Sequence, residues 1–391
     1  MLAGLLFAVR DAEDRPDRLA ATLPFAGTNL IEYQARLLVA AGASQIVVVV
    51  AKLTPDLLGS ISRIGRRGVA VDAVRTAAEA AEKLHPLSRV VVLADGLVTT
   101  PGIVQQLAQE GADTLLVVGE DEAGSAFERI GGRLAWAGAA RLGQARVRDV
   151  AAMPRDYDLQ SALLRAASQA GAAHLLLPAN AAGEGHGIEC RAGALEARGR
   201  TVLSAMMSGA RGWFDRWVVA PVGRLALPAL VTRGVPAGGL ALAGALLGAG
   251  GLAAIYADLS ATGLALTLLA VVAWALGGAL ARLRDEHRLA RGLAAARLLL
   301  PALAVALLAV RLGHWSGEAT APVAAGSLVM LGGLLERAAL GRARRGWWGS
   351  PGAYLIILLL ATLLGLPVAG LVALEIYAAA SLYEALRPPR P

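Results

Sequence analysis

The sequence predicts two domains of different fold class, an α/β domain with a mainly parallel sheet and an all-α domain of six transmembrane helices. Two observations lead to this prediction. Strand-like and helical segments alternate through the first two hundred residues, where charges occur at ordinary spacing. From about Gly234 onward, Leu, Ala, Val and Gly form runs that approach the roughly 20 apolar residues needed to cross a bilayer. We therefore expect the α/β domain over residues 1–200, an interfacial segment over 201–233 and the membrane domain over 234–391.

The composition narrows the compartment and the partners. The net charge is +7, but nearly all basic residues are Arg, with Lys only at Lys52 and Lys83. No basic cluster interleaved with aromatic residues occurs in the first half, so we expect no nucleic-acid partner. Cys190 is the only cysteine, which excludes an intramolecular disulfide and fits a reducing compartment. We expect it to be an inert, half-buried thiol, and we interpret Met1–Val9 as a first strand rather than a signal peptide.

Short β-prone runs recur through the α/β domain with helical stretches between them, which is typical of a mainly parallel sheet covered by helices. Asn29 and Glu32 have the spacing of a capping box, and Gly42 would end the helix that they begin. A second helix is predicted to start at Thr54, with a proline in its first turn. Phe127–Gly138 is predicted to form a hairpin around two glycines. The predicted strands are Leu5–Val9, Gln45–Val50, Val69–Val74, Arg89–Asp95 and Thr114–Gly119.

Residues Leu23–Val50, LPFAGTNLIEYQARLLVAAGASQIVVVV, resemble the segment that follows the Gly-rich nucleotide loop of sugar-phosphate nucleotidyltransferases. The resemblance implies a nucleotidyltransferase-like fold through about residue 200. It also implies that Asp95 corresponds to the metal-binding aspartate that holds a divalent cation such as Mg²⁺ against nucleotide phosphates. Arg10 and Arg15 are then candidates for contacting a nucleotide phosphate. The alternative for Asp95 is structural, because Asp-Gly after a buried strand often forms only a turn.

Several positions depart from the family's pattern. The loop Val9–Arg15 has no glycine and three acidic residues, whereas the family's loop holds phosphates with glycine backbone N–H groups and a basic side chain. Thr28 stands where the family has a lysine, and the second metal-binding aspartate falls at Glu189 or Cys190. Because an acidic, crowded loop is a poor phosphate site, we do not expect nucleotidyl transfer. Three further titratable residues lack the spacing of metal ligands: His174, Glu184 and His186.

The second half reads as a membrane domain. Trp213–Val219 and the apolar patch that follows to Val231 are typical of an amphipathic helix in the headgroup region. Arginines concentrate after the second and fourth predicted spans. By the positive-inside rule, these loops and both termini face the cytoplasm, with the spans in the inner (cytoplasmic) membrane of a prokaryote. Small residues favour close helix packing, and with it a homodimer through the membrane domain. The spans are Pro236–Tyr256, Ala261–Ala281, Leu293–Leu312, Ala321–Leu335, Ala353–Leu366 and Pro367–Leu386, and the loop arginines are Arg282, Arg284, Arg288, Arg291, Arg297, Arg337, Arg342, Arg344 and Arg345.

The segment Gly277–Arg282 resembles the centre of the signature of CDP-alcohol phosphatidyltransferases, with Gly278, Ala281 and Arg282 as the matching residues. In that family, four aspartates on two helix ends bind two metal ions, grip a CDP pyrophosphate and activate the acceptor hydroxyl. In the register set by the three matching residues, none of the four positions is an aspartate. The resemblance thus implies the family's membrane fold without ligands for its two-metal mechanism. The four replacing residues are Trp274, Gly277, Ala295 and Leu299, and the signature's later glycine becomes Arg291.

The order of the parts resembles that of bifunctional proteins that make CDP-inositol and then transfer inositol phosphate from it to an alcohol. Our first hypothesis is a membrane-bound pseudoenzyme that binds a nucleotide or CDP-alcohol, a lipid headgroup or a partner protein. One alternative is an active enzyme that transfers a phospho-alcohol from a CDP-activated donor in phospholipid or inositol-phosphate synthesis. Another is a membrane scaffold or transporter, although no span carries a coupled pair of charges. Glu336 and Glu375 are the carboxylates near or within the later spans, and Glu375 is a functional candidate because of its depth.

Overall fold

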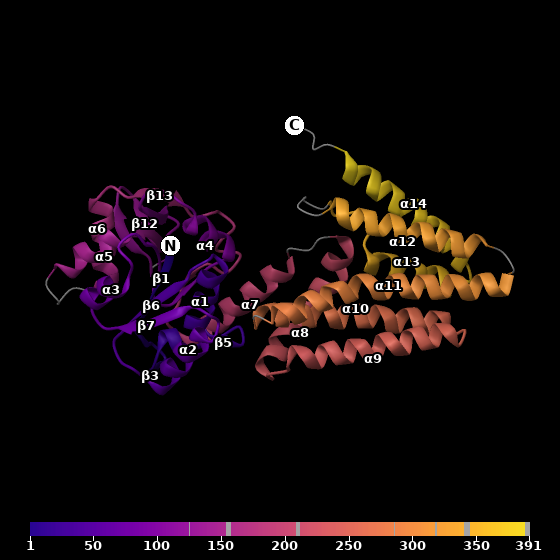
Figure 1. Cartoon of the computed structure of the whole chain (residues 1–391), viewed down its shortest axis with the longest axis horizontal. Helices are drawn as coiled ribbons and strands as arrows, with labels where there is room; N and C mark the ends of the chain where they lie inside the picture. The colour runs from indigo at the N-terminus through magenta and orange to yellow at the C-terminus, as the bar shows by residue number, and fades with distance from the viewer. Residues whose placement is uncertain are drawn as a thin grey trace. The chain divides into compact units, whose positions relative to one another are not determined.

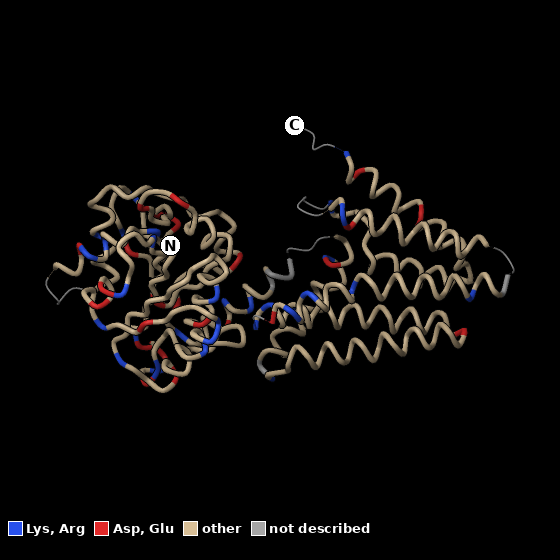
Figure 2. The backbone as a smooth tube through the Cα atoms, viewed as in Figure 1, with Lys and Arg blue, Asp and Glu red and all other residues tan. Residues whose placement is uncertain are grey.

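The computed structural model describes residues 1–124, 126–153, 158–208, 212–284, 286–316, 319–339 and 345–387. The chain divides into two compact units, Met1–Ala205 and Met206–Pro391, which we call unit 1 and unit 2 (Figure 1). Charged residues are spread through unit 1, whereas in unit 2 most lie near helix ends (Figure 2). Three charged residues that the sequence places in loops lie outside the described residues: Asp285, Arg342 and Arg344.

Unit 1 is an α/β domain built on a mainly parallel sheet. The strand order is β13-β10-β12-β8-β1-β6-β7, and β11 pairs with β12. β1 pairs in parallel with β6 and β8, β7 pairs in parallel with β6, and β12 runs antiparallel to β8 and β10. All five predicted strands are present with small shifts at their ends, and the hairpin is β11 with β12. The strands are β1 Leu2–Ala8, β6 Gln45–Val50, β7 Ala70–Val74, β8 Arg89–Leu93, β10 Thr114–Gly119, β11 Glu128–Gly131, β12 Leu134–Gly143 and β13 Ala173–Leu176.

The remaining elements of unit 1 are helices and short strands. Every side chain of β1 and β6 is buried, which explains why these strands are continuous apolar runs without alternation. Thr54 caps α2 as predicted, because its side chain accepts a hydrogen bond from Leu57 N–H. The helices are α1 Leu30–Ala40, α2 Pro55–Gly65, α3 Ala77–Lys83, α4 Pro101–Ala108, α5 Gln144–Ala151, α6 Leu159–Gln169 and α7 Ala192–Ser208. The short strands are β2 Asp11–Ala12, β3 Arg15–Leu19, β4 Pro24–Phe25, β5 Thr28–Asn29, β9 Leu97–Val98 and β14 Gly187–Ile188.

The capping box predicted at the start of α1 is wrong, although the helix begins directly after Asn29. Asn29 makes no side-chain cap, and its Nδ2 donates to Ser60 Oγ at 2.9 Å instead. Glu32 accepts two hydrogen bonds from Arg63, the shorter at 2.7 Å. Ser60 and Arg63 both belong to α2. The buried Glu32 carboxylate gains a charge-assisted partner in this way, which is stronger than a bond to its own helix end.

The order of the strands creates a topological switch point beside β1. The chain passes from β1 through α1 to β6 on one side of β1, and after β7 it returns to β8 on the other side. In open α/β sheets, ligands bind in the crevice outside the carboxyl ends of the strands at such a point. The carboxyl ends of β1 and β8 lead directly into Val9 and Asp95. The fold therefore brings the predicted metal ligand and the predicted phosphate loop to one edge of the sheet.

Unit 2 is helical. A π-helical turn, η2 Asp215–Val219, leads into α8 Ala220–Thr232 in the segment predicted to be interfacial. Four later helices, α9, α10, α11 and α14, are long and apolar enough to cross a membrane. α13 is apolar but shorter, and α12 does not meet the same measure. The structure thus supports four of the six predicted spans. The helices after α8 in the described part of the chain are α9 Ala237–Tyr256, α10 Ser260–Leu283, α11 His287–Ser316, α12 Thr320–Ala338, α13 Pro351–Leu363 and α14 Pro367–Leu386.

Small residues let α9 and α10 approach closely, as the sequence predicts. A Cβ added at Gly244 would overlap the Trp274 indole, and one at Gly251 would lie 2.6 Å from Thr267 Oγ1. The Trp274 indole N–H also donates to the Ala241 carbonyl at 3.0 Å, so the side chain is fixed against α9. The two glycines therefore set the spacing of this helix pair.

Candidate switch-point site

Asp95 begins a tight turn at the end of β8. Leu97 N–H donates to the Ala94 carbonyl at 3.2 Å, and Gly96 has φ +80°. A Cβ at Gly96 would lie 2.7 Å from the Glu189 carbonyl oxygen, so the close approach of the chain segment before α7 also requires glycine here. The Asp-Gly pair thus forms the turn that was the structural alternative for Asp95. The same turn holds the Asp95 side chain at the switch point.

The Asp95 carboxylate is bound by the loop that would be expected to hold phosphate. Its Oδ2 accepts hydrogen bonds from Val9 N–H at 2.8 Å and Arg10 N–H at 2.7 Å. The backbone N–H of Asp95 donates to Gln160 Oε1 on α6 at 2.9 Å. Asp95 is 1% exposed, and among the described residues its Oδ1 has no hydrogen-bond partner. A protein carboxylate therefore occupies the N–H groups that a nucleotide phosphate would need.

Burial dominates the electrostatics of Asp95. It raises the pKa of the carboxyl from 3.8 to about 6, against the opposing effect of the two backbone N–H groups and of Arg10. Arg10 lies beside both Asp95 and Cys190, but its own side chain is exposed. Arg15 is exposed on β3 and makes none of the Asp95 contacts. Of the three predicted ligand residues, the structure brings together Asp95 and Arg10 only.

The acidic residues of the Val9–Arg15 loop hold it in a hairpin. β2 and β3 pair antiparallel, with Asp11 opposite Leu19 and Ala12 opposite Arg15. Each of the three acids has a partner, and a fourth bond runs from the loop backbone to the segment before α7. The contacts are Asp11 with Lys52 at 2.5 Å, Glu13 with Arg191 at 2.6 Å, the Asp14 carboxylate with Ala192 N–H at 2.9 Å, and Glu13 N–H with the Cys190 carbonyl at 3.0 Å. The loop is thus fastened to neighbouring protein segments by the residues that make it unsuitable for phosphate.

The position of the second metal-binding aspartate supplies no second carboxylate for Asp95. Glu189 forms an ion pair with Arg198 on α7. Cys190 lies near Asp95, and burial raises the pKa of its thiol, so the neutral form is favoured. This agrees with the prediction of a half-buried, inert thiol.

The residues at the switch point do not fit Mg²⁺. This ion requires near-octahedral oxygen ligands, usually one or two carboxylates together with water and phosphate oxygens. Asp95 Oδ2 is already bound by two N–H groups, and Oδ1 is enclosed by protein. Within the described residues there is no group of three or more His, Cys, Asp or Glu side chains that could hold a metal ion. We therefore assign no catalytic step to a metal ion at this site.

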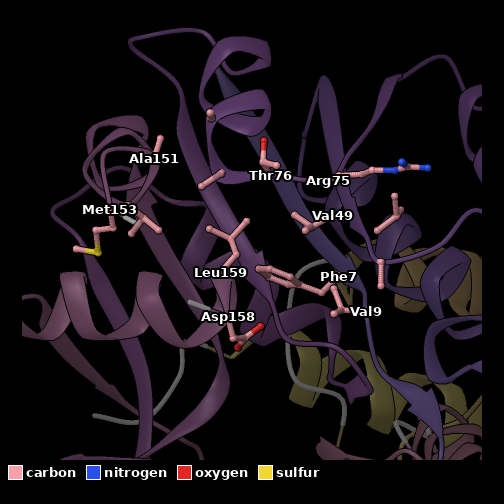
Figure 3. A pocket seen from close by; sticks show the side chains of 14 residues that line it. Phe7, Val9, Val49, Arg75, Thr76, Ala151, Met153, Asp158 and Leu159 are labelled. Carbon is pink, nitrogen blue, oxygen red and sulfur yellow. The ribbon is translucent and has the colours of Figure 1, made fainter. Parts of the chain in front are cut away.

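A separate cavity of about 310 Å³ lies next to the switch point, at the carboxyl ends of β1 and β6. Its walls combine apolar side chains, among them Phe7, Val49 and Leu159, with the polar side chains of Arg75, Thr76 and Asp158. Figure 3 shows the Phe7 ring directed toward Leu159, with the Asp158 carboxylate below it and the Arg75 guanidinium extending away. Asp158 also caps α6 by accepting from Ser161 N–H at 3.1 Å. The volume lies at the lower end of the range for small-molecule sites.

The three residues that lack metal-ligand spacing in the sequence, His174, Glu184 and His186, have separate surroundings. His186 is buried, with Nε2 2.9 Å from the Ala137 carbonyl and Nδ1 3.0 Å from Thr99 Oγ1. Burial lowers the pKa of His186 to about 4, so its ring is neutral at physiological pH. Because a carbonyl only accepts, Nε2 carries the proton and donates it, while Nδ1 accepts from Thr99. His174 is exposed on β13, and Glu184 accepts from Asn180 Nδ2 at 2.6 Å.

Sequence reasoning missed the residues that fix the Asp95 turn. The Gln34 amide donates to the Ala94 carbonyl at 3.0 Å and the Leu97 carbonyl at 2.8 Å. Tyr33 O–H donates to the Thr99 carbonyl at 2.6 Å, and burial raises the pKa of Tyr33 to about 12. The only sign of these contacts in the sequence was the presence of Tyr33 and Gln34 on the otherwise apolar face of α1. Their partners lie 60 to 66 residues away, so only the folded chain identifies them.

The second candidate site, at the end of α10, has no carboxylate at any of the four positions that the resemblance assigns to it. Gly277 is buried, and a Cβ there would lie 3.2 Å from both Leu240 Cβ and Leu293 Cδ1, so an aspartate would not fit without movement. Ala295 and Leu299 are exposed, whereas Leu293 on the same helix α11 contacts Gly277. In the register predicted from the sequence, the four positions therefore do not converge. Of the three matching residues, Gly278 and Ala281 are buried in the helix pair and Arg282 is exposed.

Other charged residues of unit 2 are placed as follows. Arg297, predicted as a loop arginine, donates from Nη2 to Asp215 at 2.8 Å and so links α11 to η2. Glu375 is half-buried on α14 and makes no hydrogen bond or ion pair with any described residue. The depth of Glu375 remains its only functional signal.

No protein-family model and no curated protein matches the chain. Many solved structures are similar to part of it, and three of them illustrate the likeness. Inositol-1-phosphate CTP transferase from T. maritima matches 45% of this chain and 84% of its own, with a TM-score of 0.35 and 13% identity. UDP-glucose pyrophosphorylase from Acinetobacter baumanii matches 52% and 93%, with a TM-score of 0.37 and 14% identity. UDP-glucose pyrophosphorylase complexed with UDP-glucose matches 52% and 98%, with a TM-score of 0.35 and 9% identity. Because these TM-scores lie below 0.5, the likeness does not support a function, and the proposal below is argued from the geometry of the site.

Proposed function

We propose that unit 1 binds the nucleoside part of a nucleotide without catalysing metal-dependent nucleotidyl transfer, and that unit 2 anchors it to a membrane. The observation that carries this proposal is the Asp95 carboxylate bound to Val9 and Arg10 N–H. A nucleotide phosphate is an anion that needs the same N–H groups, so the two compete. With these donors occupied and Asp95 withdrawn from solvent, the triphosphate has neither its cradle nor its metal ligand.

The cavity beside β1 and β6 is the part of the site that remains open. The Phe7 and Leu159 side chains on its wall suit a planar base, which gains free energy by leaving water and by packing against them. The carboxylate of Asp158 at its edge disfavours a polyphosphate and can accept a hydrogen bond from a ribose hydroxyl or an exocyclic amine. We therefore expect a nucleoside or nucleotide ligand whose affinity does not depend on Mg²⁺.

The test is a thermal-shift titration of the detergent-solubilised full chain with cytidine, CTP and a CDP-alcohol, each with Mg²⁺ and with EDTA. Binding to the folded state raises the melting temperature in proportion to the logarithm of ligand concentration over dissociation constant. We expect equal shifts with Mg²⁺ and with EDTA, and a loss of the shift in Ala151→Leu, which reduces the cavity. A shift that requires Mg²⁺, or release of pyrophosphate from CTP, would show that the metal-dependent activity survives.

The second candidate function is transfer of a phospho-alcohol from a CDP-activated donor by unit 2. Only the sequence resemblance at Gly278, Ala281 and Arg282 favours it. Trp274 donates to the Ala241 carbonyl and Gly277 has no side chain, so neither position supplies a metal ligand. Incubation of the full chain in lipid vesicles with a CDP-alcohol and Mg²⁺ decides the matter. We expect no CMP above the level of a boiled control, and turnover that depends on Arg282 would support this alternative instead.

A further inference from the structure

A groove of about 520 Å³ runs along unit 2 between α11, α12 and the first turn of α13. Aliphatic side chains form its walls, among them Leu299 and Val305 from α11 and Leu328 and Val329 from α12. Neither Trp274 nor Gly277 lines this groove, although Leu299, one of the four positions compared with the family's aspartates, lies on its wall. Such aliphatic walls suit a hydrocarbon chain.

Two features of the sequence create the groove. Gly332 and Gly333 on α12 lack side chains at its base, and a Cβ added at Gly333 would meet nothing within 4 Å. Pro301 lies inside α11 and lines the opposite wall. Leu299 is 63% exposed and Val329 39%, so the groove opens to the outside of the bundle. On a helix that is apolar enough to cross a bilayer, as α11 is, the outside is lipid.

One end of the groove is charged. Arg337 is exposed there and forms no ion pair with a described residue, while the half-buried Glu336 precedes it. From Leu328 to Arg337 the groove extends about 14 Å along α12, at 1.5 Å per residue. Arg337 is at the end of α12. If α12 crosses the bilayer beside α11, this long basic side chain reaches the membrane surface and Leu328 lies toward the bilayer centre. An apolar channel that ends in a surface arginine complements a chain with an anionic head.

We propose that this groove binds a glycerophospholipid, with one acyl chain between α11 and α12 and the phosphate at Arg337. The Arg337 guanidinium can donate two parallel hydrogen bonds to a phosphate. Arg therefore recognises a phosphate more specifically than Lys does. The acyl chain replaces solvent or disordered lipid over the gap left by Gly332 and Gly333. This proposal rests on the residence of unit 2 in a bilayer, but it is independent of the nucleotide cavity in unit 1.

The test measures lipid binding by native mass spectrometry of the full chain released from detergent. The probes are dioleoylphosphatidylglycerol and dioleoylglycerol, which share their acyl chains and differ in the phosphate. Gly333→Leu fills the groove, and Gly326→Leu is the matched control. Gly326 lies on the same helix, and a Cβ there also meets open space, but it is not part of the groove. Arg337→Gln removes the proposed phosphate contact while keeping a long polar side chain.

We expect the wild type to prefer phosphatidylglycerol over dioleoylglycerol by about tenfold, the effect of one charge-assisted contact. Gly333→Leu should weaken the binding of both lipids by about tenfold, and Gly326→Leu should change neither. Arg337→Gln should bind the two lipids equally. Equal binding of phosphatidylglycerol by wild type and Gly333→Leu would overturn the groove assignment. An unchanged preference in Arg337→Gln would overturn the phosphate contact, and a dimer without bound lipid would show that a second copy covers the groove.

Discussion

At the scale of single residues, Asp95 shows how the surroundings of a side chain decide its chemistry. It lies at the carboxyl end of β8, as the resemblance to nucleotidyltransferases implies, yet its carboxylate accepts hydrogen bonds from Val9 and Arg10. An isolated buried carboxylate is costly, and these two donors offset only part of that cost. The remaining cost is visible as the raised pKa of the Asp95 carboxyl, about 6 against 3.8.

The raised pKa of Asp95 predicts a pH-dependent gain in stability for Asp95→Asn. Because the pKa in the folded state exceeds that in the unfolded state, folding favours the protonated acid. The favourable contribution of Asp95 is full below about pH 4 and is lost as pH rises through 6. A neutral amide avoids that loss. A shift of about two pKa units corresponds to about 3 kcal/mol, so we expect Asp95→Asn to raise the free energy of unfolding by about 1–3 kcal/mol at pH 8.

The measurement is chemical unfolding of the detergent-solubilised full chain at pH 5 and pH 8. The gain in the free energy of unfolding of Asp95→Asn should be clearly smaller at pH 5 than at pH 8. Asp17→Asn, an exposed carboxylate on β3, is the control and should have little effect at either pH. A loss of stability at pH 8 in Asp95→Asn would contradict the burial argument.

At the scale of elements, close helix contact in unit 2 depends on particular glycines rather than on small residues in general. Gly244 faces the Trp274 indole, whereas a Cβ at Gly250 on the same helix would lie 3.9 Å from Leu266 Cδ1, an ordinary contact. The two positions have the same chemistry and differ only in what they face. They therefore separate the packing cost of a methyl group from its effect on helix propensity.

Gly244→Ala and Gly250→Ala should have opposite effects on the thermal stability of the full chain. Alanine in place of a helical glycine gains about 1 kcal/mol from backbone entropy in soluble helices, and Gly250→Ala should show part of this gain. Gly244→Ala must move Trp274 and break its hydrogen bond to Ala241, so we expect a net loss of about 1–3 kcal/mol. Melting in detergent, followed by Trp fluorescence, measures both. Similar effects of the two substitutions would indicate that α9 and α10 are not tightly packed at Trp274.

At the scale of the whole molecule, the number of membrane crossings decides where the loops lie. The basic residues of unit 2 occur mostly where α10, α12 and α14 end and where α11 begins, whereas the turn between α9 and α10 carries Asp258, paired with Arg311 at 2.5 Å (Figure 2). Such an asymmetry is what the positive-inside rule requires if all six helices cross. With four crossings instead, the loop between α12 and α13 would lie on the opposite side.

Single cysteines in a Cys190→Ser background distinguish six crossings from four. We choose Leu259→Cys, Glu286→Cys and Gly346→Cys, all at exposed positions. With six spans, a membrane-impermeant maleimide applied to intact spheroplasts should label position 259 only, and positions 286 and 346 should react after permeabilisation. Labelling of 346 together with 259 in intact spheroplasts would support four spans in place of six.

The sequence by itself determined the elements whose signals are local. The β1 and β6 runs, the Thr54 start of α2, the hairpin of β11 and β12, and the four long apolar helices all follow from patterns within about 20 residues. The absence of glycine and the presence of three acids in the Val9–Arg15 loop are also local features, and they led to the prediction that this loop is a poor phosphate site. Asp95 was also identified, with its two possible roles left open.

Only the tertiary structure decided which groups those residues contact. Asp95 receives its donors from residues 85 and 86 positions away, Glu32 takes Arg63 rather than its own helix end, and Arg297 pairs with Asp215 across 82 residues. Ala295 and Leu299 are exposed while Leu293 contacts Gly277 for the same reason, since the rotation of α11 depends on its packing against α9 and α10. Buried polar groups need partners, and the choice among distant partners is made by the whole fold. At the switch point, that choice gave the Asp95 carboxylate the backbone N–H groups of Val9 and Arg10.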